Sequence, residues 1–238
     1  HWTWSPLPLP WRERSELKRD DRQASKMIEL YTWTTPNGRK VSILLEELGL
    51  AYDVHPVNLS KGEQKSPEFR MISPSGKIPA IRDSESGQTV MESGAIMLWL
   101  AERERRFLGE AHDRANVLEW LMWQMSAQGP TLGRIHQFAR YGNALGDVAE
   151  TLLREQGAQI YTVLNERLRG RDYVAGDGAG VYTIADMAIW PWVSRFEWHE
   201  TDLHDYPEVL KWYRRLAERP AVQRGYQIPH AVEAIPLP

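Results

Sequence analysis

A short polar run, Thr34-Thr35-Pro36-Asn37, stands where a strand pattern gives way to a helix pattern. The free N–H groups at a helix N-terminus stabilise a thiolate, so a junction of this kind suits sulfur chemistry. The chain contains no cysteine, which excludes a protein thiol nucleophile, a disulfide and a Cys-based metal site. Thr35 and Asn37 can donate hydrogen bonds to a sulfur, but neither can accept its proton at neutral pH. Any sulfur chemistry at this junction must therefore use a sulfur from outside the protein.

The same run also has a purely structural interpretation. Asn is a favoured helix N-cap residue and Pro stiffens a turn, so Asn37 with Pro36 could simply begin a helix. Thr34 competes with Thr35 for the chemical role, although the alternation of a strand places their side chains on opposite faces. The residues alone leave both questions open.

Two later segments carry polar groups that could meet this junction. A cis peptide bond before Pro79, in Lys77-Ile78-Pro79, would leave the Ile78 N–H and C=O free to pair with an extended peptide. An ordinary edge proline is the alternative. Glu92 and Ser93 begin a helix whose exposed amides could hold a small carboxylate, unless Ser93 is only a helix cap. Together the three segments predict a groove for a short anionic peptide.

Strand and helix patterns alternate in the part of the chain that would position these groups. They predict a strand, a helix, a strand, a short helix, two strands and a helix, at residues 27–33, 38–50, 52–57, 66–72, 77–83, 88–91 and 92–104. The first strand-helix-strand unit should be parallel, and the closing hairpin should add an antiparallel edge. This βαβαββα order predicts an α+β, thioredoxin-like domain with a four-stranded mixed sheet over residues 27–108.

From residue 109 the strand patterns stop, and long amphipathic helix patterns follow. Apolar residues recur at three-and-four spacing in the segments 114–127, 148–168, 183–198 and 207–220, so residues 109–238 should form an all-α helical bundle. Thr183 and Asp186 have the spacing of a helix N-cap and a first-turn acid, which predicts a structural pair. The glycine-rich run at residues 176–180 lacks phosphate-binding spacing and is predicted to be a loop.

Composition limits the function further. The chain has 238 residues, a formal net charge of -3 and no concentrated basic stretch, so no nucleic-acid partner is expected. No apolar run reaches the roughly 18 residues needed to cross a bilayer, so no membrane partner is expected either. His199 and His204 lack ligand spacing and are interpreted as part of a solvated turn, so we expect no metal.

Residues 1–26 are rich in Pro and charge and lack the apolar region of a signal peptide. Met27 directly precedes the first strand pattern. We therefore expect residues 1–26 to be a leader outside the fold, either non-native or disordered. A regulatory arm is the alternative.

Five motifs from Met27 onward together resemble the cytosolic glutathione transferases, in particular the bacterial nu class and its Ure2-like relatives. They are TTPNGRKVSILLEELG, KGEQ..PEF..ISPSGKIPA, ESGAIMLWLAE, WLMWQ....GP.LG and YTIADMAIWPW, and the resemblance covers the chain except the leader. It implies glutathione as co-substrate without a metal, and a homodimeric, cytoplasmic protein.

The resemblance also implies a role for each candidate residue. Thr35 and Asn37 would be the catalytic residues that stabilise the glutathione thiolate. Six residues would bind the rest of glutathione: Gln64 and Lys77 at its glycine end, Ile78 at its cysteinyl backbone ahead of cis-Pro79, and Glu92 with Ser93 at its γ-glutamyl group. Beside these roles, a second substrate is expected between the domains, in a pocket lined by Trp33, His136, Phe138 and Tyr141. Packing in the core is the alternative for these side chains, because most aromatic residues at helical spacing are core residues.

These roles predict an enzyme that uses glutathione either to reduce small disulfides and peroxides or to modify electrophiles. One position departs from the resemblance. Relatives with pronounced disulfide-reductase activity carry an arginine that reaches glutathione across the dimer, whereas this chain has Leu152 there and Arg154 on a different helix face. A glutathione-binding regulatory or chaperone-like protein with little turnover is the alternative function.

Overall fold

The structure is a computed structural model that describes residues 27–238, so the expected leader at residues 1–26 lies outside the described part. The first part of the fold contains strands and helices in the order that the sequence predicts. They are β1 (Ile28–Thr32), α1 (Pro36–Leu48), β2 (Tyr52–Pro56), α2 (Pro67–Ile72), β3 (Ala80–Asp83), β4 (Thr89–Met91) and α3 (Ser93–Glu104).

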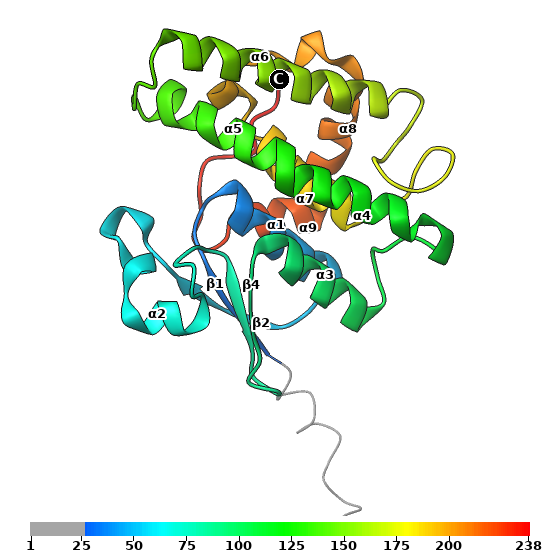
Figure 1. Ribbon diagram of the computed structural model, residues 1–238. Helices are drawn as coiled ribbons and strands as arrows, with labels where there is room; N and C mark the ends of the chain where they lie inside the picture. The colour runs from blue at the N-terminus through cyan, green and yellow to red at the C-terminus, as the bar shows by residue number, and fades with distance from the viewer. Residues whose placement is uncertain (1–26) are drawn as a thin grey trace, which may run out of the picture.

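The strands form one mixed sheet in the order β2-β1-β3-β4. β1 pairs with β2 in parallel and with β3 antiparallel, and β3 pairs with β4 antiparallel, so the predicted thioredoxin-like domain is confirmed. Successive side chains of β1 face opposite sides of the sheet. Leu30 joins the large apolar core, whereas Tyr31 packs against Phe69 of α2. Figure 1 shows α2 on one side of the sheet and α1 with α3 on the other.

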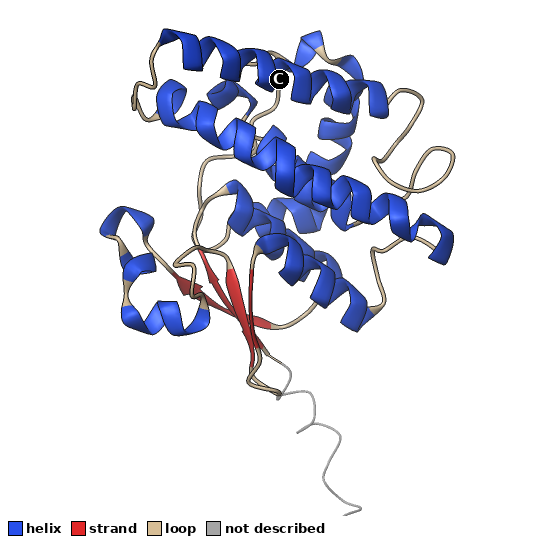
Figure 2. Cartoon of the chain, in the orientation of Figure 1, coloured by secondary structure: helices blue, strands red, loops and turns tan. Residues whose placement is uncertain are grey.

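Beyond α3 the described chain is helical, and Figure 2 shows that the strands are confined to the first part. The α-helices are α4 (Arg114–Trp123), α5 (Gly129–Ile135), α6 (Asp147–Arg167), α7 (Ile184–Val193), α8 (Pro207–Ala217) and α9 (Pro220–Tyr226). This arrangement confirms the predicted all-α second part. One continuous cluster of buried apolar side chains runs through both parts and includes Leu44 of α1 and Ile189 of α7. Over residues 27–238, no helix is both long and apolar enough to span a bilayer.

Two predicted helices differ from the structure by more than three residues at one end. The helix expected at residues 114–127 continues, because π-helical segments at Gln124–Gln128 and His136–Arg140 follow α4 and α5. A π-helical turn has no apolar period of its own to reveal it, and such turns are frequent at functional sites. The helix expected at residues 183–198 ends at Val193, and its apolar pattern continues into a separate 3₁₀ turn.

Helix α9 returns to the first part and packs against α1. Gly225 lies so close to Ile43 that a Cβ on it would stand 2.6 Å from the Ile43 Cα, so no larger residue fits there without a backbone shift. Ser42 Oγ donates a hydrogen bond to the Gly225 carbonyl at 2.7 Å. The Arg39 guanidinium lies 3.5 Å from the centre of the Tyr226 ring. The helix that begins at the candidate junction is thus held from behind by α9.

The start of α7 confirms the predicted structural pair. Thr183 and Asp186 form a capping box. The Thr183 side chain accepts the backbone N–H of Asp186, and the Asp186 side chain accepts the backbone N–H of Thr183. The Asp186 carboxylate also accepts hydrogen bonds from the Val174 N–H at 3.0 Å and from the Trp212 Nε1–H at 2.9 Å. The glycine-rich run at residues 176–180 is a loop, as predicted.

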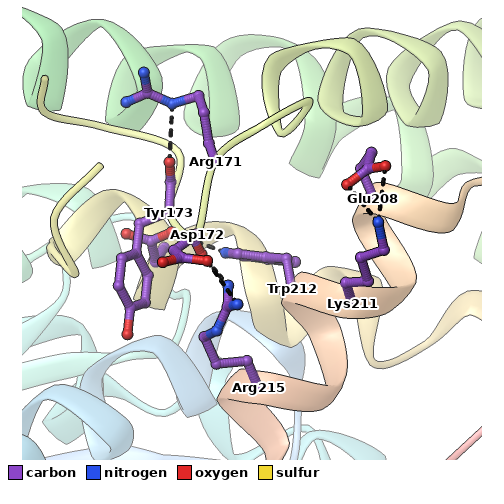
Figure 3. Close-up of polar contacts among 8 residues, drawn as sticks. Arg171, Asp172, Tyr173, Glu208, Lys211, Trp212 and Arg215 are labelled. Atoms are coloured by element: carbon purple, nitrogen blue, oxygen red, sulfur yellow. Dashed lines mark hydrogen bonds and ion pairs between the residues drawn. The ribbon is translucent and has the colours of Figure 1, made fainter. Parts of the chain in front are cut away.

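Helix α8 fixes the loop that leads to this capping box. Figure 3 shows Arg215 of α8 beside Asp172, with Arg215 Nη2 2.6 Å from the Asp172 carboxylate. Arg171 Nε donates to the neighbouring Tyr173 carbonyl at 3.2 Å. Both side chains of the Arg215–Asp172 pair are partly exposed to solvent. Such a pair typically contributes between about 0 and 1 kcal/mol to the free energy of unfolding.

Candidate functional site

The three segments singled out in the sequence meet at one cavity of about 370 Å³. Its lining comes from both parts of the fold: the start of α1, the residues before β3, the start of α3, the first π-helical segment, the start of α5 and the end of α7. The lining residues are Asn37, Lys40, Lys77, Ile78, Pro79, Glu92, Ser93, Gln124, Met125, Gly129, Pro130 and Trp192. Six of the predicted site residues are therefore brought together.

Thr35 rather than Asn37 caps α1. Thr35 Oγ1 accepts a hydrogen bond from the Gly38 N–H at 3.1 Å, which leaves the Thr35 hydroxyl hydrogen available for another acceptor. Helix α1 begins at Pro36, so Asn37 lies inside the first turn. The interpretation of Asn37 as the N-cap residue is therefore wrong.

The amide of Asn37 is oriented by α7. Trp192 Nε1–H donates to Asn37 Oδ1 at 3.1 Å. Because the amide oxygen already has a donor, the amide nitrogen with its two hydrogens remains to donate to a ligand in the cavity that Asn37 lines. The first turn of α1 thus offers two side-chain donors, one from Thr35 and one from Asn37.

The segment before β3 offers backbone groups. The Ile78–Pro79 peptide bond is cis, as expected. Within residues 27–238, neither the N–H nor the C=O of Ile78 has a hydrogen-bond partner, while the Lys77 carbonyl accepts from Ser73 Oγ at 2.8 Å. A free N–H and C=O on one residue can pair with an extended peptide in the manner of an added strand.

The start of α3 has an unusual backbone. Glu92 has a φ of 69°, which costs a non-glycine residue of the order of 1–3 kcal/mol and is typical of ligand-binding sites. Ser93 is the first residue of α3, and its Oγ lies 3.3 Å from Lys40 Nζ and 3.8 Å from Met125 Sδ. Ser93 therefore directs its hydroxyl toward the cavity lining and is not a helix cap.

Six lining residues were missed by the sequence reasoning: Lys40, Gln124, Met125, Gly129, Pro130 and Trp192. Lys40 is 1% exposed, and its Nζ donates to Gln124 Oε1 at 2.5 Å. Burial lowers the pKa of Lys40 to about 7, an effect that the charge of Glu92 opposes. Lys40 follows Asn37 by three positions, and this helical spacing could have placed it on the same face. Gln124 and Met125 come from the π-helical segment, which has no local sequence signal.

Two predicted residues lie beside the cavity rather than in its lining. Thr35 directly precedes α1. Gln64 lies in a 3₁₀ turn, and its buried Oε1 has no hydrogen-bond partner within residues 27–238. The Gln64 carbonyl would lie 3.0 Å from a Cβ on Gly76, so this turn packs next to Lys77.

The four residues expected to form a second-substrate pocket do not line this cavity. Trp33 packs edge-on against His230, with ring centroids 5.0 Å apart. Phe138 is buried in the apolar core, whereas Tyr141 is exposed and packs edge-on against Trp198. None of the four lines the cavity that holds the other predicted residues, and their role around a second substrate stays a prediction.

His136 belongs to a buried chain of polar groups instead. Its Nε2 lies 2.8 Å from His199 Nε2, and His199 Nδ1 lies 2.7 Å from the Tyr161 hydroxyl. His199 is only 4% exposed, so its interpretation as part of a solvated turn is wrong. Burial lowers the pKa of His136 to about 4 and that of His199 well below its usual value, so both rings are neutral at pH 7. His136 also stacks on Trp192.

Leu152 and Arg154 lie on α6, and neither lines the cavity. Leu152 is about half exposed, at 52%. Arg154 Nε donates to Glu200 at 2.6 Å, and its guanidinium lies over the Phe138 ring. Arg154 is thus occupied elsewhere, in line with its different helix face.

One group of side chains in the described residues has the spacing of metal ligands. His112 Nε2 lies 3.5 Å from Asp113 and 3.4 Å from Asp177. His112 and Asp177 are exposed, and the group does not line the cavity. Contacts of the His112 ring with the two carboxylates account for these distances. The expectation that the protein uses no metal stays a prediction.

Comparisons with known proteins show the family of the chain. The family model described as glutathione S-transferase, N-terminal domain, matches residues 34–103, and the model for the C-terminal domain of the same family matches residues 137–215. The disulfide-bond oxidoreductase YfcG of Escherichia coli is 42% identical over 201 residues, which cover 82% of this chain and 92% of YfcG.

Solved structures are similar over most of the chain. A glutathione transferase from Pseudomonas putida, with one glutathione disulfide bound per subunit, has a TM-score of 0.79 and 37% identity, covering 85% of this chain and 92% of its own. Ure2p in complex with S-hexylglutathione has a TM-score of 0.77 and 28% identity, covering 84% and 97%. The cavity at the start of α1 and these matches place the chain in the glutathione transferase family, close to the bacterial nu class and to Ure2p-like structures.

Proposed function

We propose that this protein binds glutathione in the cavity at the start of α1 and uses its thiolate as a nucleophile, chiefly in disulfide reduction. The observation that carries the proposal is the pair of free donors on Thr35 and Asn37 beside that cavity. Ile78 offers its backbone to the cysteinyl residue, as in an added strand. Glu92 and Ser93 hold the γ-glutamyl group, and Lys77 with Gln64 holds the glycine end.

The donors stabilise the thiolate without acting as bases. A free thiol with a pKa of about 8.5 is only a few per cent ionised at pH 7, and lowering the pKa to about 6.5 makes it roughly three-quarters ionised. That gain of about 25-fold is offset by a loss of about eightfold in intrinsic nucleophilicity. The remaining factor of about three shows that most acceleration must come from aligning the sulfur with its target.

The reaction proceeds in two balanced steps. The glutathione thiolate attacks one sulfur of a small disulfide, so a new S–S bond forms and the other sulfur leaves as a thiolate. A second glutathione then attacks the mixed disulfide, which yields glutathione disulfide and the second product thiol. Glutathione is the two-electron reductant, and the disulfide substrate is reduced. In this proposal the protein is a homodimer in the cytoplasm, and no metal takes part.

Leu152 argues against disulfide reduction and in favour of another glutathione-dependent activity. The resemblance associates pronounced disulfide-reductase activity with an arginine at this position, and Leu152 is an exposed apolar side chain. Conjugation of glutathione to electrophiles is therefore a second candidate activity. A regulatory protein with little turnover is the alternative from another class, and the free donors on Thr35 and Asn37 argue against it.

Steady-state turnover distinguishes these functions. Reduction of 2-hydroxyethyl disulfide by glutathione, coupled to glutathione reductase, is compared with conjugation of 1-chloro-2,4-dinitrobenzene in wild type, Thr35→Ala and Thr35→Ser. We expect disulfide turnover to be retained with Ser and lost by about 10- to 100-fold with Ala, because only Ala removes the donor.

Conjugation without disulfide turnover would assign the protein to transfer chemistry. Absence of both activities, with glutathione still bound in calorimetry, would overturn the catalytic proposal in favour of a regulatory role. Absence of glutathione binding would overturn the proposed ligand as well.

A further inference from the structure

Lys40 is the one lysine side chain among the buried polar residues of the described part, and it lines the candidate cavity. A buried ammonium group is expensive unless it is paired, so buried lysines are normally matched by a carboxylate. Within residues 27–238 no carboxylate oxygen lies within 4.0 Å of Lys40 Nζ. The structure therefore leaves the Lys40 side chain without a direct ion pair.

The contacts of Lys40 Nζ are all neutral. Gln124 Oε1 lies at 2.5 Å, Ser93 Oγ at 3.3 Å and Met125 Sδ at 3.5 Å. A thioether sulfur is a weak acceptor, so only the first two contacts are substantial hydrogen bonds. The side chain is positioned by its neighbours, but its charge is not neutralised by them.

We propose that Lys40 is the buried counter-charge for the carboxylate that glutathione presents to Ser93, and that Lys40 takes up a proton when this carboxylate binds. This inference rests on the proposed function, because it assumes that glutathione occupies the cavity. It assigns to Lys40 a positioning role that acts on the ligand through Ser93.

Ser93 connects the binding of the ligand carboxylate with the protonation of Lys40. A neutral amine can accept the Ser93 hydroxyl hydrogen, whereas an ammonium group can only donate to Ser93 Oγ. Protonation of Lys40 therefore turns the Ser93 hydroxyl hydrogen away from Lys40. In the unliganded arrangement the other acceptor near that hydroxyl is Met125 Sδ, at 3.8 Å. A ligand carboxylate supplies the strong acceptor that is missing.

The charged groups around Lys40 are few, so its titration can be assigned. Glu92, at the start of α3, faces it with an opposite charge and raises its pKa against the larger effect of burial. The π-helical segment contributes the neutral Gln124 and Met125. The end of α7 contributes the neutral Trp192, and the segment before β3 contributes Lys77, the other cation in the lining. A pKa of about 7 leaves about three-quarters of Lys40 neutral at pH 7.5.

Calorimetric proton counting tests the proposal. S-methylglutathione is titrated into the protein at pH 7.5 in two buffers of different ionisation enthalpy, because the methyl group removes the titrating thiol. We expect an uptake of about 0.7 proton per site in wild type, since most of Lys40 must become charged. We expect an uptake near zero in Lys40→Met, with affinity lowered by about tenfold or more. Lys211→Met removes an exposed lysine of α8 and should match wild type.

Two ligand analogues keep the test independent of the variant's folding. In one, 4-aminobutyryl-S-methylcysteinylglycine, the γ-glutamyl α-carboxylate is absent and the amino group is kept. In the other, glutaryl-S-methylcysteinylglycine, the carboxylate is kept and the amino group is absent. We expect wild type to take up a proton with the second analogue and none with the first.

Each outcome decides a different question. Binding of S-methylglutathione without proton uptake would overturn this inference and leave the proposed function standing. Equal uptake in Lys40→Met and wild type, or uptake with the analogue that lacks the carboxylate, would also overturn it. Failure of S-methylglutathione to bind wild type would contradict both the inference and the proposed function.

Discussion

The protein has two helices that begin with a threonine N-cap, and the two helix starts differ in which hydrogen-bonding groups remain without a partner. Helix α1 is capped by Thr35 and helix α7 by Thr183, and each cap accepts a backbone N–H of the first turn. At α7 the acid three residues after the cap, Asp186, closes a capping box and accepts further hydrogen bonds from elsewhere in the chain. At α1 no acidic residue lies in the first turn.

The buried ionisable groups near the two starts differ in the same way. Asp186 and Lys40 are both almost fully buried. Asp186 has donors from three elements of the chain around its carboxylate. Lys40 has neutral partners and a cavity beside it. The comparison teaches how to distinguish the two kinds of helix start. A start whose buried groups all find partners within the chain is structural, whereas a start with unpaired donors beside a cavity is a candidate ligand site.

The largest effect, on the free energy of unfolding, is expected when the capping box at the start of α7 is broken. Asp186→Ala should lower the free energy of unfolding by about 3–5 kcal/mol, because it leaves buried donors without an acceptor. Urea unfolding measures the change. Asp172→Ala, which breaks the partly exposed pair with Arg215 shown in Figure 3, is the control and should cost about 1 kcal/mol or less. Equal effects of the two variants would contradict the assignment of Asp186 as a structural anchor.

Substitutions at the two cap residues, Thr35 and Thr183, should have different effects on activity. Thr35→Ala and Thr183→Ala should each destabilise a helix start by about 1 kcal/mol. Only Thr35→Ala should lower the disulfide turnover of the proposed function, by about 10- to 100-fold, because it alone removes a donor beside the cavity. Turnover per folded molecule is the quantity to compare. If Thr183→Ala lost as much turnover, the effect would be one of stability.

The pH dependence of stability should report Lys40. Burial holds its pKa in the folded protein at about 7, below the value of 10.5 for an unperturbed lysine. Between these values the unfolded chain binds one more proton, so the contribution of Lys40 to stability rises with pH and is lost as pH falls toward 7. From pH 7 to pH 9 wild type should gain about 2 kcal/mol relative to Lys40→Met in urea unfolding. Parallel profiles for the two proteins would show that Lys40 keeps an ordinary pKa.

The smallest effect is expected from the residue that orients Asn37. Trp192→Phe removes the Nε1–H that occupies Asn37 Oδ1, so the Asn37 amide can turn its oxygen toward a bound sulfur. The pKa of bound glutathione should rise by a few tenths to about one unit, which titration of the thiolate absorbance measures. Trp198→Phe, at a half-buried tryptophan that packs against Tyr141 and has no hydrogen bond to Asn37, is the matched control. A thiol pKa that stays unchanged in Trp192→Phe would mean that the Asn37 amide is held by other contacts.

Local patterns predicted the fold because its elements follow from residues near each other in the chain. The alternation in β1 and the three-and-four spacing of the helices indicated the order and type of the elements. The same reasoning failed where distant residues decide. His136 and His199 are 63 positions apart and meet only in the folded core. The π-helical segment that brings Gln124 beside Lys40 has no period of its own.

Within the site, the sequence identified individual binding side chains better than the residues that contact them. It singled out Asn37 and Ser93 but left open whether each was a cap. That question is decided by where the helices begin, because Thr35 and Glu92 hold the N-cap positions of α1 and α3. Side chains from other elements then contact the two groups: Trp192 for Asn37 and Lys40 for Ser93. The four residues expected around a second substrate stay a prediction: Phe138 lies in the apolar core and Tyr141 is exposed, so their burial alone assigns them no common role.

The contact between Gly225 and Ile43 has a consequence for how the protein is made. During synthesis α1 leaves the ribosome early, but the groups on its back, including Arg39 and Ser42, pair with the backbone of α9. These contacts cannot form until residue 226 has been added to the chain. The helix that carries the candidate site is therefore among the first to be made and among the last to be enclosed.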